Sequence, residues 1–311
     1  MVVVLAGGTG GAKLARGMLD AADALTVVAN TADDTEVYGV HVSPDPDLVT
    51  YWLADAIDAR GYGIDGDTWE VMGALEAAGR ETWFRLGDRD LAMCLIRTEL
   101  LAAGERLTAA HDAVVRAMGV RARVLPMSDE PVRTFVGSGG RARAFQEFMI
   151  VDRAAGPIES VELRGLESAR PGPEVLEAIA SAEAIVIGPS NPVISIGPIL
   201  ALPGMRAALR AASAPVVAVS PFVEGHAVKG PTEPFMEHFE LELGAAGMAA
   251  AYGDVLDGIV ADEGFGGAPV PVLVTDTLMG DATARRRVAT ETLEFARSLS
   301  GGRASAGPDR R

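Results

Sequence analysis

Short apolar runs alternate with helical patterns along most of this chain, and this alternation limits its possible folds more than any other feature. Runs with the length and composition of buried strands cover residues 1–6, 24–30, 122–126, 132–137, 184–188, 215–220, 257–261 and 271–275. Helical patterns cover residues 11–22, 173–182, 203–212, 234–248 and 281–298. Strands that alternate with helices form mostly parallel sheets with helices on both faces. The sequence therefore predicts an α/β, Rossmann-like, doubly wound fold.

The alternation is interrupted in the first half of the chain. Between about residues 46 and 120 the strand signal vanishes and four helical stretches follow one another, which predicts a helical insertion after the second strand. We expect residues 1–45 and 121–299 to form a nucleotide-binding core, and residues 46–120 to form the insertion. Residues 131–165 indicate antiparallel β structure at an edge. The small, polar tail 300–311 is expected to be disordered.

Composition narrows the choice of partners. The formal net charge of −16 argues against nucleic acid, because a phosphate backbone requires a basic face. No apolar stretch approaches the roughly 18 residues of a membrane span, so we expect a cytoplasmic protein without membrane contact. Cys94 is the only cysteine, which excludes an internal disulfide and a cysteine-based metal cluster.

The opening stretch "VVVLAGGTGGAKL" is a strand, a glycine-rich loop and the start of a helix. Lys13 stands where a dinucleotide fingerprint needs its third glycine, and Leu14 stands where a Walker loop needs Ser or Thr. The physical argument survives without either motif, because glycines and a helix N-terminus present backbone N–H groups to an anion. We expect phosphate binding by Gly8, Thr9, Gly10, Gly11 and Lys13. The alternative is a tight structural turn.

An acidic stretch, "ANTADDTEVYGVHVSPDPDL", follows the second predicted strand. Its carboxylates lie beside the glycine loop if the sheet is Rossmann-like, and hard oxygen ligands suit Mg²⁺. Asp33 and Asp47 are the first candidates for metal ligands, followed by Asp34 and Asp45. The alternative is that some of these residues only form turns.

Other polar residues follow later strands or lie in the insertion. Ser190 and Asn191 come after the strand at 184–188, and Lys229 lies beyond the strand at 215–220. Trp83 and Phe84 could wall a flat aromatic ligand, and Asp88 could cap a helix. The histidines His41, His111 and His238 lack metal-ligand spacing and are expected to be incidental.

Six motifs in this order resemble one known family over roughly residues 1–298. They are "LAGGTGGAKL", "NTADDTEVYG", "WFRLGDRDLA" with a later "RT", "IGPSNPVISIGPIL", "SPFVEGHAVKGP" and "TDTLM". The chain resembles the 2-phospho-L-lactate transferase family of coenzyme F-420 biosynthesis, whose actinobacterial relatives are described as phosphoenolpyruvyl transferases.

The resemblance implies a transfer reaction that needs Mg²⁺. A guanosine diphosphate ester of 2-phospholactate or phosphoenolpyruvate is the donor, and the deazaflavin alcohol FO (7,8-didemethyl-8-hydroxy-5-deazariboflavin) is the acceptor. The terminal ribityl hydroxyl of FO attacks the phosphorus that bears the three-carbon acid, and GMP leaves. A homodimer is the default assembly.

The reaction that the resemblance implies suggests a role for each candidate residue. The catalytic candidates are Asp33, Asp47 and Lys13, one carboxylate orienting or deprotonating the hydroxyl. The nucleotide and its phosphates are assigned to Gly8, Thr9, Gly10, Gly11, Lys13, Ser190, Asn191 and Lys229. The FO site is assigned to Asn30, Trp83, Leu86, Asp88 and Arg89.

Two other functions compete with this one. A nucleotide-sugar-binding regulatory protein of the same superfamily would keep the glycine loop and "GPSNP", but would not explain "LGDRDLA" together with the aspartate-rich turn. A nicotinamide-dependent oxidoreductase would need an acidic residue at the tip of the second strand, where Asn30 stands. The choice between phospholactate and phosphoenolpyruvate stays open, since a pocket separates such similar groups by only about 1–3 kcal/mol.

Overall fold

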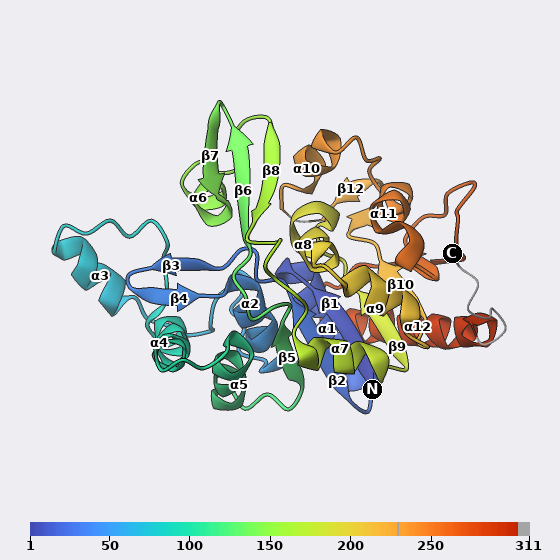
Figure 1. Cartoon of the computed structure of the whole chain (residues 1–311), viewed down its shortest axis with the longest axis horizontal. Helices are drawn as coiled ribbons and strands as arrows, with labels where there is room; N and C mark the ends of the chain where they lie inside the picture. Colours follow the sequence, from blue (N-terminus) through green and yellow to red (C-terminus); the bar gives the residue numbers. More distant parts are fainter. Residues whose placement is uncertain (229, 304–311) are drawn as a thin grey trace.

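The computed structural model describes residues 1–228 and 230–303 and is built on a seven-stranded parallel sheet (Figure 1). The strand order is β14-β13-β10-β9-β1-β2-β5, and every pair in it is parallel. The strands are β1 (Val2–Ala6), β2 (Leu25–Ala29), β5 (Arg123–Pro126), β9 (Ala184–Ile187), β10 (Val216–Val219), β13 (Gly258–Ala261) and β14 (Val272–Val274). This order reverses direction between β1 and β9, as in a doubly wound sheet. The predicted fold class is confirmed.

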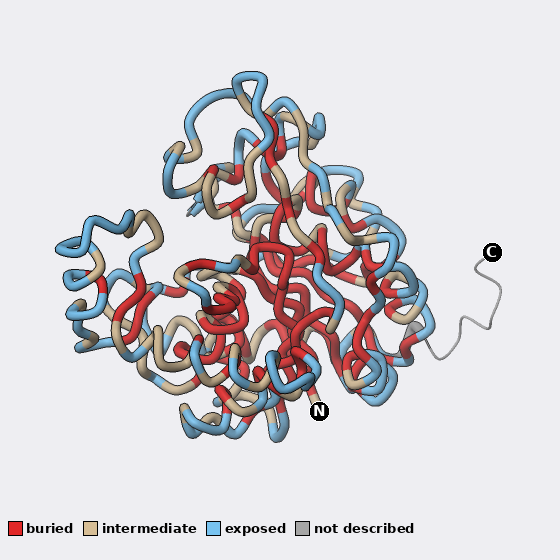
Figure 2. Tube along the Cα trace, turned by 60° about the vertical axis from the view of Figure 1, so that its left-hand side comes forward, coloured by how far each residue is buried: buried red, intermediate tan, exposed pale blue. Residues whose placement is uncertain are grey.

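Buried aliphatic side chains explain why the strands form where the sequence predicts them. Every residue of β1, β2, β9, β10 and β13 is buried, because helices cover both faces of the sheet. One face is covered by α1 (Gly8–Ala21), α2 (Pro44–Leu53) and α12 (Ala282–Arg303). The other is covered by α7 (Pro173–Ala180), α8 (Gly197–Ala201), α9 (Met205–Ala211) and α11 (Ala245–Tyr252). Figure 2 shows the buried trace concentrated in this central region.

The expected run of four helices is present between β2 and β5. It consists of α2, α3 (Glu70–Ala77), α4 (Asp88–Ala102) and α5 (Leu107–Ala117). The first of these, α2, packs against α1 and the sheet, whereas α3 and α4 lie to the side of the core (Figure 1). A hairpin of β3 (Thr35–Val37) and β4 (Val40–Val42), which the sequence did not indicate, packs its apolar side chains under α3 and α4.

The antiparallel structure predicted at residues 131–165 is present but forms a separate sheet, so the prediction that it lies at an edge of the central sheet is wrong. Strand β6 (Arg133–Ser138) lies between β7 (Arg141–Ala144) and β8 (Ser160–Arg164). The short helix α6 (Phe145–Ile150) follows β7 and buries Phe145 and Phe148 against the core side of this unit. The three strands and α6 project upward from the central sheet in Figure 1.

Two helix predictions need correction. The pattern at 234–248 is two helices, α10 (Thr232–His238) and α11, because Gly244 adopts a φ of 98° between them. Helix α12 continues to Arg303, so the prediction of a disordered tail is wrong for residues 300–303. Residues 304–311 lie outside the described part of the chain. The short elements that remain are η1 (Pro192–Ile196), η2 (Gly253–Val255), β11 (Phe222–Val223) and β12 (His226–Ala227).

No single helix within residues 1–228 and 230–303 has the length and apolar composition needed to cross a membrane. One bent pair, Pro192–Ala201 with Met205–Ala211, passes that test of length and composition together, with a bend of 81°.

Candidate active site

A cavity of about 1170 Å³ opens at the carboxyl ends of the central strands. Its walls come from the loops after β1, β9 and β10, from the start of α2, from the insertion, and from α6. Ligands of doubly wound proteins bind at this edge, where the strand order reverses. This volume exceeds the usual range of about 300–1,000 Å³ for small-molecule sites, so the cavity has room for two substrates at once.

The glycine loop lies against the loop that follows β9. A Cβ on Gly10 would lie 1.9 Å from the carbonyl oxygen of Pro189, and one on Gly11 would lie 2.6 Å from Ser190 Oγ. These two glycines therefore permit close packing of two loops, which agrees with the alternative interpretation of this motif as a tight structural turn. Gly8 and Thr9 line the cavity together with Gly10, so the loop also offers backbone to a ligand.

Two further predicted phosphate-site residues lie at this end of the cavity. Lys13 is one turn into α1 and lines the cavity, with its ammonium 5.8 Å from the centre of the Trp52 ring. Ser190 also lines the cavity, and its Oγ accepts a hydrogen bond of 3.2 Å from the Gly7 N–H. The structure thus brings a cation and the glycine loop together.

The neighbouring Asn191 lines the cavity and caps η1, because its Oδ1 accepts from the N–H groups of Val193 and Ile194. Its buried Nδ2 has no hydrogen-bond partner among the described residues. Lys229 lies outside the described residues.

Of the buried aspartates Asp33, Asp34, Asp45 and Asp47, only Asp33 and Asp45 have no ion pair with a side chain of the described residues. Asp45 accepts hydrogen bonds from the Gly8 N–H at 2.7 Å and from Asn30 Nδ2 at 3.0 Å. Asp33 lines the cavity, and its buried Oδ1 has no partner among the described residues. Burial raises the pKa of both carboxyls, and the charge of Asp45 raises the pKa of Asp33 further. A bound cation would stabilise both ionised forms.

Asp34 and Asp47, by contrast, are already bonded to side chains that stabilise a carboxylate. Asp34 accepts from Ser43 Oγ at 2.8 Å and contacts His41 Nε2 at 2.9 Å. It lines a smaller cavity of about 200 Å³, which shares Asp33, Phe145 and Gln146 with the large one. Asp47 lines the large cavity and receives two hydrogen bonds from the guanidinium of Arg97, at 2.7 and 2.8 Å. The four aspartates thus divide into two pairs with different surroundings.

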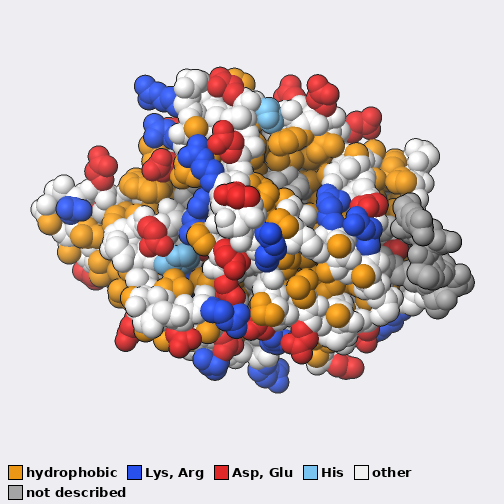
Figure 3. All heavy atoms as spheres, viewed as in Figure 1, with side chains coloured by type: hydrophobic (Ala, Val, Ile, Leu, Met, Phe, Trp, Pro, Cys, Tyr) orange, Lys and Arg blue, Asp and Glu red, His pale blue; other side chains and the backbone are white. Residues whose placement is uncertain are grey.

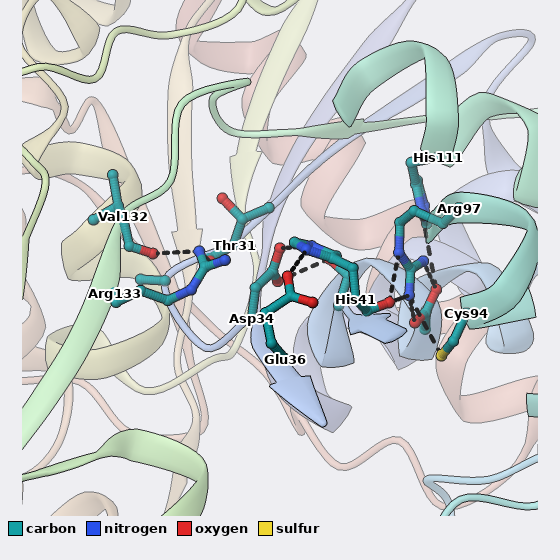
Figure 4. Close-up of polar contacts among 12 residues, drawn as sticks. Thr31, Asp34, Glu36, His41, Cys94, Arg97, His111, Val132 and Arg133 are labelled. Carbon is teal, nitrogen blue, oxygen red and sulfur yellow. Dashed lines mark hydrogen bonds and ion pairs between the residues drawn. The ribbon is translucent and has the colours of Figure 1, made fainter. Parts of the chain in front are cut away.

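His41, expected to be incidental, connects these groups (Figure 4). Its Nδ1 contacts Glu36 Oε1 at 2.7 Å, and its carbonyl oxygen accepts from Nε and Nη2 of Arg97 at 3.2 and 3.0 Å. Burial lowers the pKa of His41, but the hydrogen bond and charge of Asp34 outweigh burial and raise the pKa overall. Spacing could not reveal this role, because Arg97 lies 56 residues along the chain from His41.

His111 and Asp90 also surround Asp47. Burial lowers the pKa of His111 to about 4, and its Nδ1 lies 3.9 Å from Asp47 Oδ1. Asp90 lines the cavity and accepts a hydrogen bond of 2.7 Å from the Tyr51 hydroxyl. Burial and then the charge of Asp47 raise the pKa of Asp90 to about 7. Asp90 is therefore a carboxyl that changes charge near neutral pH.

Asp47, Asp90 and Cys94 form the one group of three potential metal-ligating side chains found within the described residues, with ligand atoms within 4.8 Å of one another. Arg97 Nη2 lies 3.6 Å from Cys94 Sγ and also bonds Asp47, so a guanidinium already supplies positive charge there. Burial raises the pKa of Cys94, which disfavours the thiolate that a metal would need. Asp33 and Asp45 suit a hard cation better.

The insertion supplies an aromatic and cationic wall. Trp83 and Leu86, both predicted to contact FO, line the cavity. The other FO candidates lie differently: Asn30 is buried beneath Asp45, and Arg89 Nη1 donates to the carbonyl of Asp65 at 2.9 Å. Asp88 accepts from the backbone N–H groups of Glu70 and Val71, so it caps α3 rather than its own helix.

Four residues that the sequence did not indicate extend this wall. Arg60 lies 4.8 Å from the ring centre of Tyr62 and 5.5 Å from that of Trp69, and Arg85 lies 5.3 Å from the same Trp69 ring. All four line the cavity. Alternating guanidinium and aromatic groups suit a flat ligand that carries negative charge.

The fold and this site together define a Rossmann-like α/β protein whose cavity joins a glycine-rich loop, buried carboxylates and an aromatic–cationic wall. The model of one family, described as 2-phospho-L-lactate transferase CofD, matches residues 2–271. The chain belongs to the 2-phospho-L-lactate transferase family.

Relatives with two different names are similarly close to this chain. A phosphoenolpyruvate transferase of Kitasatospora aureofaciens is 40% identical over 297 residues, which cover 88% of this chain and 92% of the relative. A 2-phospho-L-lactate transferase of Methanosarcina mazei is 40% identical over 265 residues, which cover 84% of this chain and 87% of the relative. A solved structure of a UPF0052 family protein from Bacillus halodurans has the same fold, with a TM-score of 0.62 and 19% identity, covering 94% of this chain and 98% of that one.

Proposed function

We propose that this chain transfers a phospholactyl or phosphoenolpyruvyl group from a guanosine diphosphate-linked donor to the ribityl hydroxyl of FO, in coenzyme F-420 biosynthesis. Its relatives are named for transfer of these two groups. The observation that carries the proposal is one continuous cavity with a phosphate-type loop at one end and an aromatic–cationic wall at the other. Two substrates in one cavity can place donor phosphorus and acceptor hydroxyl together.

The donor occupies the end of the cavity near β1 and β9. Backbone of Gly8 and Gly10 and the ammonium of Lys13 bind its phosphates, and Asn191, with an unpartnered Nδ2, binds the nucleoside. The deazaflavin ring of FO lies against the wall that contains Trp83 and Trp69. The homodimer and the cytoplasmic location belong to the same proposal.

The residues present fit a magnesium ion. Asp33 has a buried oxygen with no hydrogen-bond partner among the described residues, and burial and the charge of Asp45 raise its pKa although Arg133 acts in the opposite direction; the pKa of Asp45 is raised as well. These two carboxylates would hold Mg²⁺, with phosphate oxygens among the remaining ligands. When bound, the ion supplies positive charge that offsets the charge developing on the transferred phosphoryl group.

The chain's own residues then handle the hydroxyl of FO. Asp47 lines the cavity and orients that hydroxyl by accepting its hydrogen bond, since each carboxylate oxygen has a second lone pair. The hydroxyl oxygen forms a bond to the phosphorus that bears the three-carbon acid, and the bond from that phosphorus to GMP breaks. The proton passes to Asp90, whose pKa of about 7 suits a general base at neutral pH.

Titration of the purified protein with FO, followed by absorbance and fluorescence with and without GDP and magnesium, tests the proposal. We expect binding of FO that is tightened by GDP and Mg²⁺. Mass spectrometry of the product then identifies the three-carbon group, because the two candidates differ by two hydrogen atoms. Binding of a nucleotide sugar without any binding of FO would instead establish the regulatory alternative.

A further inference from the structure

Arg97 is a fully buried arginine in the third turn of α4, and its side chain has a relative exposure of 0%. Its donors contact three protein groups: the carboxylate of Asp47, the carbonyl oxygen of His41 and the sulfur of Cys94. It does not line the large cavity. The guanidinium therefore acts on other residues of the chain rather than on a ligand.

The contacts of Arg97 connect α4 to β4 and to α2, the helix that packs against α1 and the sheet. Asp90, Cys94 and Arg97 are spaced four and three residues apart, so they share the face of α4 that meets α2. Asp47 lies in the first turn of α2, two residues after Asp45, which binds the Gly8 N–H. One ion pair thus fixes the wall that carries Asp90 relative to the glycine loop.

A purely stabilising role explains this ion pair poorly. Burying two charges is costly, and replacing a buried pair with apolar side chains of similar size is often neutral or stabilising. The bidentate geometry instead fixes the direction of the Asp47 carboxylate, which a single-point contact from lysine would not do.

We propose that Arg97 is a positioning residue that aims the Asp47 carboxylate at the acceptor hydroxyl. This inference rests on the proposed transfer and adds to it the group that orients one of its carboxylates. Arg97 itself touches no substrate. Its effect on turnover is transmitted through Asp47, so the two residues must act as one unit.

A double-mutant cycle with Arg97→Lys and Asp47→Asn tests the inference. Arg97→Lys keeps the positive charge but loses the two-point geometry. We expect kcat to fall by about 10- to 100-fold, because small misplacements of reacting groups have effects of that size. The KM of the donor and the Kd of GDP should stay within about twofold of wild type. The doubly substituted enzyme should turn over no more slowly than Asp47→Asn alone.

Arg106→Lys is the matched control. Arg106 also joins the insertion to the core, through Asp129 at 2.8 Å, but it lies outside the cavity. Turnover of Arg97→Lys equal to that of Arg106→Lys would overturn the inference. Multiplying losses in the double variant would overturn it as well, because they would show that Arg97 acts independently of Asp47.

Failure of the proposed function and misfolding of the variant are distinguished from failure of the inference as follows. If wild-type enzyme transfers nothing to FO, the proposed function fails before the cycle is measured. If circular dichroism shows that Arg97→Lys does not fold, the double variant Arg97→Gln with Asp47→Asn is measured in its place, because it removes both charges of the buried pair. Turnover of that pair equal to Asp47→Asn supports the inference, and lower turnover overturns it.

Discussion

The aspartates around the cavity differ in the side chains that contact their carboxyl groups. The guanidinium of Arg97 pairs with the carboxylate of Asp47, and His41 and Ser43 form hydrogen bonds with Asp34. Asp33 and Asp45 are left with raised pKa values, and Asp90 has a pKa of about 7. The sequence indicated the aspartates because they are close together in the chain. It could not indicate their partners, because Arg97 and Asp47 lie 50 residues apart.

Asp90→Asn should change how stability depends on pH. The folded protein binds a proton at Asp90 up to a pH of about 7, whereas the usual pKa is 3.8, so the folded state holds more protons between these values. Wild-type stability therefore falls as pH rises through that window. We expect Asp90→Asn to be more stable than wild type at pH 8, by roughly 1–3 kcal/mol, and similar near pH 4. Urea unfolding at both values measures this, and equal differences at the two would contradict it.

Asp33→Asn should separate stability from ligand binding. Asn removes a buried carboxyl whose Oδ1 has no hydrogen-bond partner among the described residues and whose pKa is raised mainly by burial, so the unliganded protein should melt at a higher temperature than wild type. Wild type should gain about 2.7 kcal/mol from ligand at roughly 100 times its Kd. Thermal melts in EDTA and in Mg²⁺ with GDP measure both effects. A magnesium-dependent gain as large in Asp33→Asn as in wild type would remove Asp33 from the metal site.

At the scale of elements, two insertion helices cap each other. Asp88, the first residue of α4, accepts from backbone N–H groups at the start of α3. Asp67, just before α3, accepts from the N–H groups of Arg89 and Asp90 at the start of α4. This exchange fixes Asp90 relative to Trp69, so the caps support the cavity wall as well as the helices.

Asp67→Ala should loosen this wall. Removing the cap of α4 is expected to lower the free energy of unfolding by about 1 kcal/mol, since two N–H groups lose their acceptor. Chemical denaturation measures the change, with Asp65→Ala as the control because Asp65 is an exposed acidic residue nearby. Equal losses in both variants would show that charge alone, and not capping, is responsible.

Gly10→Ala should push two loops apart. Its Cβ would lie 1.9 Å from the Pro189 carbonyl oxygen, so one backbone segment must move. We expect a loss of about 1–3 kcal/mol in stability and weaker binding of GDP, measured by calorimetry. Gly73→Ala is the matched control, since a Cβ there meets no atom within 4 Å and α3 should gain stability. Unchanged GDP affinity in Gly10→Ala would separate the loop from the phosphate site.

Elements with continuous apolar runs could be predicted from the sequence, and elements whose apolar pattern is interrupted could not. The strands of the central sheet have aliphatic runs that leave little choice of conformation. The hairpin strands β3 and β4 read Thr-Glu-Val and Val-His-Val, so Glu36 and His41 interrupt the continuous apolar run that indicates a buried strand. The predicted helix at 234–248 failed at Gly244, because the apolar spacing continues across a backbone turn.

At the scale of the whole molecule, negative charge is the dominant electrostatic feature. The chain carries a formal net charge of −16, although acidic and basic side chains are interspersed on the face shown in Figure 3. Such an excess repels itself and opposes the compact state.

Added salt should therefore stabilise the protein near neutral pH. We expect the melting temperature to rise between about 20 and 200 mM NaCl, as screening shortens the range of repulsion. The same series near the pI of about 4.7 should show little change, because the net charge is then close to zero. A fall in melting temperature with salt at neutral pH would mean that attractive ion pairs outweigh the repulsion.

The central position of β1 has a consequence for the order in which the protein can be made. During synthesis, β1 is made before both of its neighbours and can pair early with β2 on one side, but its other neighbour, β9, begins only at residue 184. Until then the strand exposes one row of backbone donors and acceptors on a run of valine and leucine, a template for aggregation. A nascent chain interrupted before β9 therefore leaves that edge of β1 open, whereas one long enough for β9 to have left the ribosome can close the middle of its sheet.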